Sequence, residues 1–196
     1  MLETYHLEKS EEPTVRLSFN HPKSGNTNSQ GEIGDLTIVT RCYNGPDKLA
    51  KNMISLSNQT RQDYDQVLIH GEVGIGLLGT SHLLSTCKDY VKGRYVLLLD
   101  DDWLLVDDEF VEKLKDRNED IVLFNMGGND MSQPRCCLVM KNEVFQKYIH
   151  RIEDVGSNLS FLEGLTQYHK DIMYSNEKLT QYNMGDIVVT AIQDKL

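Results

Sequence analysis

The stretch that decides the fold is KGRYVLLLDDD, at residues 92–102. Its centre, residues 95–99, is an unbroken apolar run, which is typical of a strand buried on both faces of a sheet. The run leads directly into Asp100, Asp101 and Asp102. In open α/β sheets, ligands bind outside the carboxyl ends of the strands. The stretch therefore predicts a central strand that ends in an acidic site.

Strands and helices alternate on both sides of this stretch. Further strands are expected at 36–40, 67–69, 121–124 and 135–140, and helices at about 47–58, 80–91, 107–117, 142–151 and 159–168. The βαβαβαβ order from 36 to 124 predicts an α/β fold, with a central, mainly parallel sheet and helices on both faces. Residues 18–34 are rich in Ser, Asn, Gly and Gln, as loops are. We therefore expect a polar N-terminal extension at 1–34 and one Rossmann-like domain at 35–196.

Composition and charge exclude several classes of function. The 196 residues include 20 Lys and Arg against 30 Asp and Glu, so the net charge is −10. This balance disfavours binding to nucleic acid or to anionic membranes. No apolar run approaches the roughly 18 residues that a membrane span needs, the opening is polar, and the four cysteines have no CxxC spacing. These features predict a reduced, cytoplasmic protein without a membrane span.

The acidic cluster is the strongest chemical signal. Three adjacent carboxylates repel one another, and either water or a bound divalent cation has to offset that cost. A solvated acidic turn is the alternative reading. The glycine-rich segment 71–79 lies between a strand and a helix, where backbone N–H groups can hold phosphate. It has neither the phosphate-loop lysine nor the Rossmann glycine spacing, so a simple tight connection is the alternative there.

Five ordered segments resemble those of family 2 glycosyltransferases with the GT-A fold. They are LTIVTRCYN at 36–44, LSNQT at 56–60, DYDQVLI at 63–69, KGRYVLLLDDD at 92–102 and CLVMKNEVF at 137–145. The resemblance extends from Leu36 to about Tyr182. It implies a GT-A domain that transfers a hexose from a nucleotide-diphosphate sugar, with a UDP-sugar favoured, to a glycan or another hydroxyl acceptor.

The resemblance also assigns roles to residues. The nucleotide-binding residues it implies are Thr40, Arg41, Tyr43, Glu72, Asp100 and Asp101, with Glu72 near the base. Asp102 would hold Mn²⁺ or Mg²⁺ against the diphosphate, and Asp100 would approach the ribose or a metal-bound water. Since few basic residues line these motifs, a metal ion is the expected Lewis acid for the departing diphosphate. Direct displacement at the anomeric carbon would invert its configuration.

A carboxylate base is expected to take the proton from the acceptor hydroxyl. Glu163 is our first choice because of its place in the chain order and its apolar neighbours, and Asp154 is the second. Glu153 and Asp130 are further rivals. Two alternatives to a glycosyltransferase stay open: a degenerate GT-A module that binds sugar or a partner without turnover, and a nucleotidyltransferase. The latter would need early glycines and a basic residue, which the segment after Val39 does not carry.

Overall fold

The computed structural model describes residues 3–5, 15–22, 34–42, 45–71, 80–125, 136–149, 172–178 and 180–182. Eight strands form one mixed sheet in the order β1-β2-β4-β3-β5-β8-β7-β9. Their bounds are β1 (Glu3–Tyr5), β2 (Val15–Asn20), β3 (Leu36–Cys42), β4 (Tyr64–Gly71), β5 (Tyr95–Leu98), β7 (Ile121–Asn125), β8 (Cys136–Lys141) and β9 (Ile172–Lys178). A separate two-stranded sheet pairs β6 (Trp103–Leu105) with β10 (Thr180–Tyr182).

The centre of the main sheet is parallel. Strand β3 pairs in parallel with β4 on one side and with β5 on the other. Beyond β5 the sheet becomes mixed, because β8 runs antiparallel to both β5 and β7, whereas β9 is parallel to β7. The predicted α/β fold class is confirmed. Because β3, β4 and β5 are parallel to one another, their carboxyl ends meet at one edge of the sheet.

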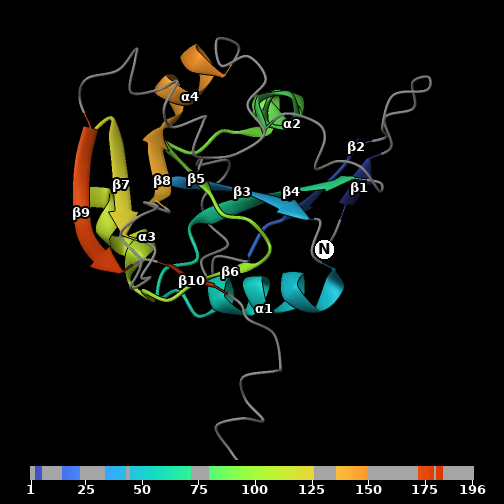
Figure 1. Ribbon diagram of the computed structural model, residues 1–196, viewed down its shortest axis with the longest axis horizontal. Helices are drawn as coiled ribbons and strands as arrows, with labels where there is room; N and C mark the ends of the chain where they lie inside the picture. The colour runs from blue at the N-terminus through green and yellow to red at the C-terminus, as the bar shows by residue number, and fades with distance from the viewer. Residues whose placement is uncertain are drawn as a thin grey trace, which may run out of the picture.

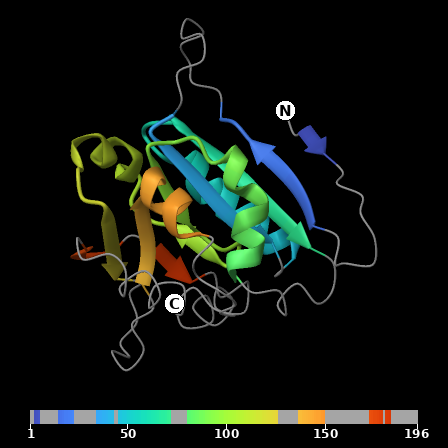
Figure 2. The same ribbon diagram turned by 90° about the horizontal axis from the view of Figure 1, so that it is seen from above.

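Helices cover both faces of the sheet, as Figures 1 and 2 show. Helices α1 (Pro46–Ser57) and α3 (Phe110–Lys113) lie on one face, and α2 (Thr80–Cys87) and α4 (Asn142–Tyr148) lie on the other. Short 3-10 turns, Lys88–Tyr90 and Leu114–Asp116, extend α2 and α3. Among the described residues, no helix is long and apolar enough to cross a membrane.

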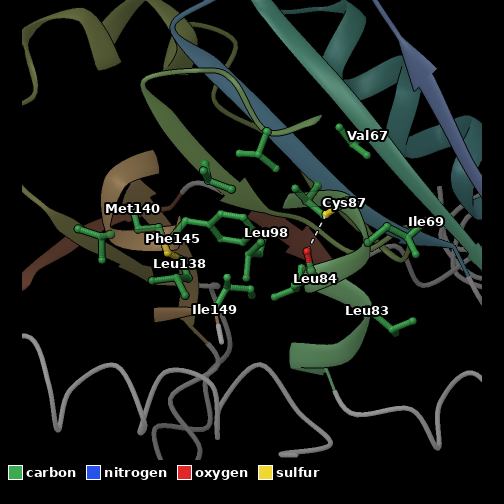
Figure 3. Close-up of a cluster of buried hydrophobic side chains, with 14 of the residues drawn as sticks. Val67, Ile69, Leu83, Leu84, Cys87, Leu98, Leu138, Met140, Phe145 and Ile149 are labelled. Atoms are coloured by element: carbon green, nitrogen blue, oxygen red, sulfur yellow. Dashed lines mark hydrogen bonds between the residues drawn. The ribbon is translucent and has the colours of Figure 1, made fainter. Parts of the chain in front are cut away.

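Strand β5 lies between two apolar clusters, one under each layer of helices. Val96 and Leu98 belong to the cluster that α2 and α4 cover, part of which Figure 3 shows. Tyr95 and Leu97, with Leu99 just beyond the end of β5, belong to the cluster of α1 and α3. None of these five side chains is more than 7% exposed. The prediction of a strand buried on both faces is therefore confirmed.

Strand β2 comes from the segment for which we expected a polar extension. It pairs antiparallel with β4 over its whole length, and Leu17 and Phe19 are buried in the core. The loop expected from residue 18 is therefore wrong for Ser18–Asn20. The alternation of Val15, Leu17 and Phe19 is a strand signal, which the neighbouring Ser, Asn and Gly content obscured.

Helix α1 begins at Pro46, one residue before the start that the sequence predicted. Gly45 precedes it with a φ of 101°, a left-handed conformation that suits glycine, and Pro46 fits the first helical turn because it lacks an N–H. Asp47 therefore lies within the first turn and makes no capping hydrogen bond. This start sets which side chains of α1 face the sheet, among them Asn52 and Leu56.

Candidate functional site

The site lies at the edge where β3, β4 and β5 end. Beyond the end of β5, the chain stays attached to β3 by backbone hydrogen bonds. Leu99 N donates to Val39 O at 3.0 Å, and Asp101 N donates to Arg41 O at 3.1 Å. The acidic segment is thus fixed beside Arg41 at the carboxyl edge, where α/β sheets bind ligands.

The three aspartates form a tight turn. Trp103 N donates to Asp100 O at 3.0 Å, which closes the turn. Asp100 is 8% exposed and Asp101 is fully buried, while Asp102 is half-buried. Two of the three carboxylates are therefore withdrawn from water, which a fully solvated acidic turn would not show. Taking carboxylates out of water is costly, so the surrounding groups have to compensate for them.

Arg41 compensates for Asp100. Its Nε donates to Asp100 Oδ1 at 2.7 Å and its Nη2 donates to Asp100 Oδ2 at 2.5 Å. Both side chains are largely buried, with 13% and 10% exposed. Paired hydrogen bonds of this kind between guanidinium and carboxylate are among the strong polar contacts in proteins. The charge of one of the three aspartates is therefore balanced within the chain.

Asp102, unlike Asp100, has a carboxylate oxygen without a hydrogen-bond donor among the described residues. This oxygen, Oδ1, is buried. Burial, together with the neighbouring Asp100 and Asp101, raises the pKa of Asp102 to about 6, against a smaller opposing effect of Lys48. The ionised form of Asp102 is thus costly in the folded protein. A cation at this carboxylate would offset the cost.

These residues fit a divalent cation held jointly with a phosphate ligand. Within the described ranges, no three His, Cys, Asp or Glu side chains are arranged as a complete metal site. Mg²⁺, however, is usually held by only one or two carboxylates, with phosphate oxygens and water completing its shell. Asp102 offers an oxygen without a donor. Asp100 can contribute as well, because carboxylate oxygens have lone pairs beyond those that Arg41 uses.

Other residues on this edge, among them the predicted site residue Thr40, have polar contacts of their own. Thr40 is fully buried, and its Oγ1 accepts a hydrogen bond from Gln66 Nε2 at 3.0 Å. His70 lies opposite Cys42 on the neighbouring strand, with its Nε2 2.6 Å from Ser18 Oγ. Burial, with Asp101 and Asp100, raises the pKa of the Cys42 thiol far above its usual range, which favours the protonated thiol.

Several predicted site residues lie outside the described residues: Tyr43, Glu72, Asp130, Glu153, Asp154 and Glu163. Their roles stay predictions, as do those of Thr40, Arg41, Asp100, Asp101 and Asp102. The structure does bring the last five together at one edge. Sequence reasoning did not single out Asn52 and Gln66. These two buried amides donate hydrogen bonds to residues of this edge, Asn52 to Asp100 O and Gln66 to Thr40 Oγ1.

Comparison with protein-family models and with curated proteins finds no match to the sequence. Solved structures do match the fold. A mannosyltransferase, PcManGT from Pyrobaculum calidifontis, aligns over 83% of this chain with a TM-score of 0.58 and 12% identity. S. aureus TarS 1–349 aligns over 76% with a TM-score of 0.57 and 13% identity. The chain has the GT-A glycosyltransferase fold.

The GT-A likeness extends to other glycosyltransferases. GlyE from Streptococcus pneumoniae aligns over 79% of this chain with a TM-score of 0.52 and 12% identity. This chain spans 60% of the length of PcManGT and of TarS 1–349, and 55% of that of GlyE. At such low identities the likeness shows the fold alone.

Proposed function

We propose that the protein is a metal-dependent glycosyltransferase. It transfers a hexose from a nucleotide-diphosphate sugar to a hydroxyl group of a glycan or another acceptor, with inversion at the anomeric carbon. UDP-sugars are the favoured donors, by the resemblance to family 2 glycosyltransferases. The metal is Mn²⁺ or Mg²⁺, and Asp102 is its main protein ligand, with Asp100 as the second.

The observation that carries this proposal is the carboxylate of Asp102. Its buried Oδ1 has no donor among the described residues, and burial raises the pKa of the group to about 6. Folding alone does not explain such a group, because a neutral or apolar side chain would be less costly there. A perturbed carboxylate at the ligand-binding edge of an α/β sheet is a typical functional-site feature.

The chemistry of the donor supports a metal at this position. A nucleoside diphosphate leaves with additional negative charge, and a divalent cation held by Asp102 would supply positive charge to stabilise it. The PcManGT structure is a complex with GDP-Man and Mn²⁺. By analogy of fold, the same combination of nucleotide sugar and cation is proposed for this chain. Because that neighbour holds GDP-Man, guanosine donors belong in the test.

The chain's own residues supply the remaining steps. Arg41 keeps Asp100 in place at the edge that the diphosphate approaches. Thr40, Tyr43, Glu72 and Asp101 are proposed to border or support the nucleotide. Glu163 is proposed as the base that takes the proton from the acceptor hydroxyl, with Asp154 as the rival.

A second candidate is a GT-A module that binds its ligand without turnover. The observation in its favour is the Arg41–Asp100 pair, which uses both oxygens of one of the two proposed metal ligands. In that case Arg41 would take the place of part of the metal's charge. Binding of a nucleotide sugar would then be independent of divalent cations, and no sugar would be released.

The test is hydrolysis and transfer with a panel of UDP-, GDP- and dTDP-hexoses, each with Mn²⁺ and with EDTA. The glycosyltransferase proposal expects release of nucleoside diphosphate from at least one donor, with Mn²⁺ only. Binding of a donor without release, unchanged by EDTA, supports the module instead. No binding and no release with any donor contradicts both.

A further inference from the structure

Beneath the acidic turn lies an asparagine with no access to solvent. Asn52, on α1, is 0% exposed. Its Nδ2 donates to the carbonyl oxygens of both ends of the turn, to Asp100 O at 3.3 Å and to Trp103 O at 2.8 Å. A single amide group thus spans the turn that presents Asp101 and Asp102.

A second buried amide holds Asn52 in this orientation. Gln66, on β4, donates from Nε2 to Asn52 Oδ1 at 3.1 Å and to Thr40 Oγ1 at 3.0 Å. Its Oε1 accepts a hydrogen bond from Asn20 Nδ2 at 3.2 Å. Because two carbonyl oxygens face one end of the Asn52 amide and a donor faces the other, only one orientation satisfies all the partners. The network connects β2, β3, β4 and α1 to the turn.

The turn needs such support because of the charges that it carries. Asp100, Asp101 and Asp102 are consecutive and at least half-buried, so their mutual repulsion favours opening of the turn. Arg41 compensates for Asp100, but Asp102 Oδ1 has no donor among the described residues. The contacts of Asn52 with both ends of the turn oppose its opening without neutralising Asp102, which leaves the charge of that carboxylate for a ligand.

We propose that Asn52 is a positioning residue for the divalent-cation site, with Gln66 as the residue that orients it. The proposal rests on the proposed function, because it takes Asp102 as a metal ligand. Asn52 itself touches neither metal nor substrate. Residues that orient metal ligands in this way commonly change metal affinity about 10- to 100-fold when they are replaced.

A residue close to α1 offers a matched control. Gln59, just beyond the end of α1, is also a buried amide, with 3% exposed. Its Nε2 donates to Asp107 O at 2.6 Å and its Oε1 accepts from Val111 N at 3.1 Å. It therefore makes the same kinds of contact as Asn52, but with residues 107–111 and not with the acidic turn. Both amides are replaced by leucine, which keeps the approximate size and removes the hydrogen bonds.

The experiment measures Mn²⁺ binding, by electron paramagnetic resonance of free Mn²⁺, with Mn²⁺ alone and with Mn²⁺ plus UDP or GDP. Thermal unfolding of each variant is recorded in parallel. Asn52→Leu is expected to weaken Mn²⁺ binding about 10- to 100-fold. Gln59→Leu is expected to lose comparable stability, but to stay within about twofold of wild-type Mn²⁺ affinity, because it shares no partner with the site.

Further variants keep the test decisive if Asn52→Leu does not fold. Asn52→Asp preserves the shape and replaces the donor with an oxygen that faces two carbonyls. Gln66→Met leaves Asn52 in place without its orienting partner. Both are expected to weaken Mn²⁺ binding, Gln66→Met by the smaller factor.

Wild-type Mn²⁺ affinity in folded Asn52 variants overturns the positioning role, and so does an equal loss in Gln59→Leu. A wild-type protein that binds no Mn²⁺ under any of these conditions overturns the proposed metal site, and this inference with it.

Discussion

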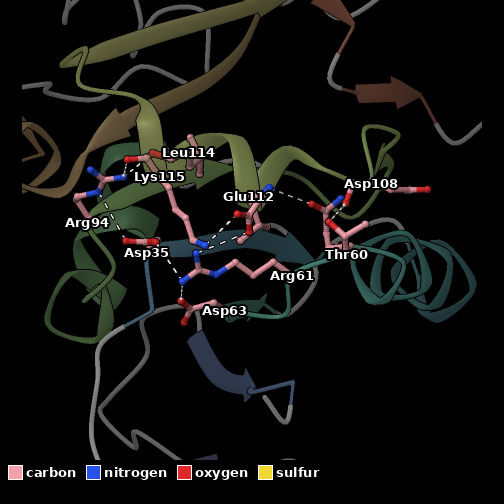
Figure 4. Close-up of polar contacts among 11 residues, drawn as sticks. Asp35, Thr60, Arg61, Asp63, Arg94, Asp108, Glu112, Leu114 and Lys115 are labelled. Atoms are coloured by element: carbon pink, nitrogen blue, oxygen red, sulfur yellow. Dashed lines mark hydrogen bonds and ion pairs between the residues drawn. The ribbon is translucent and has the colours of Figure 1, made fainter. Parts of the chain in front are cut away.

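The carboxylates at the two edges of the parallel strands differ in how far neighbouring cations compensate their charge. At the amino edge, Asp35 and Asp63 precede β3 and β4, and Glu112 lies on α3 (Figure 4). Arg61 contacts all three, with Nη2 bonded to Asp63 and 3.4 Å from Asp35 Oδ2, and Nη1 3.9 Å from Glu112 Oε2. Arg94 adds a second cation, 3.7 Å from Asp35. Each of these carboxylates has an arginine partner.

At the carboxyl edge, the three carboxylates are closer together and deeper in the protein. Arg41 pairs with Asp100, while burial and its neighbours raise the pKa of Asp102 to about 6. Compensated charges at one edge stabilise the fold. At the other edge the charge of Asp102, which Lys48 offsets only in part, makes the folded state more costly, as expected where a ligand supplies the missing charge.

The largest effect is expected for Asp102→Asn. This change removes the proposed metal ligand and keeps the shape of the side chain, so metal-dependent turnover should fall at least about a hundredfold while the protein stays folded. Asp63→Asn at the amino edge is the matched control and should leave turnover per folded molecule unchanged. Donor turnover with Mn²⁺ measures both. Equal turnover in the two variants would remove the functional distinction between the edges.

A change at the amino edge is expected to affect stability instead. Arg61→Met leaves Asp63 without its arginine and weakens the network around Asp35, which should cost about 1–2 kcal/mol of unfolding free energy for partly buried pairs. For a chain of this size, that lowers Tm by several degrees. Urea unfolding and donor turnover, measured on the same samples, separate the two effects. A loss of turnover in the folded variant without a loss of stability would reverse the roles of the edges.

The two edges should also differ in their response to pH. Because the pKa of Asp102 is raised in the folded protein, the folded state binds its proton more tightly than the unfolded state, and stability falls as pH rises from about 4 to about 6. At pH 7.5 without metal, Asp102→Asn should therefore be more stable than wild type, by on the order of 1 kcal/mol after allowance for solvent screening. At pH 4 the difference should nearly vanish. Urea unfolding at the two pH values measures it, and a variant less stable at pH 7.5 would contradict the account.

The smallest effect is expected for Lys115→Gln. Lys115 pairs with Glu112 one turn away at 2.9 Å, and both side chains are well exposed. Exposed pairs of this spacing contribute about 0.5 kcal/mol or less. A small change in the free energy of unfolding would show that the stability contributed by the amino edge comes from Arg61 and not from every ion pair at that edge. A loss as large as that of Arg61→Met would contradict this distinction.

The sequence predicted what depends on local pattern. The apolar run at 95–99 and the aspartates that follow it specify the central strand and the acidic edge, and the structure confirms both the strand and the fold class. Strand β2 was missed although Val15, Leu17 and Phe19 alternate, because the composition of the following residues suggested a loop. Long-range pairing decided that segment, since β2 is held in the sheet by its pairing with β4 and with β1.

Side-chain partners far apart in the sequence could not be predicted. Arg41 and Asp100 are 59 positions apart, and only the pairing of β3 with β5 brings them together. Helix α1 is a clearer case. Besides Leu56, which is apolar, the helix buries the polar Asn52. An asparagine in a helix normally indicates a solvent-facing position, and its burial depends on carbonyl and amide partners from other elements.

The most direct test of the central claim is the affinity for UDP and for GDP, measured by calorimetry with Mn²⁺ and with EDTA, in wild type and in Asp102→Asn. If the carboxyl edge binds a nucleoside diphosphate through a cation at Asp102, Mn²⁺ will strengthen binding of at least one diphosphate to wild type, and the gain will be lost in Asp102→Asn. Affinities that are the same with Mn²⁺ and EDTA, or a gain that persists in Asp102→Asn, would contradict the claim.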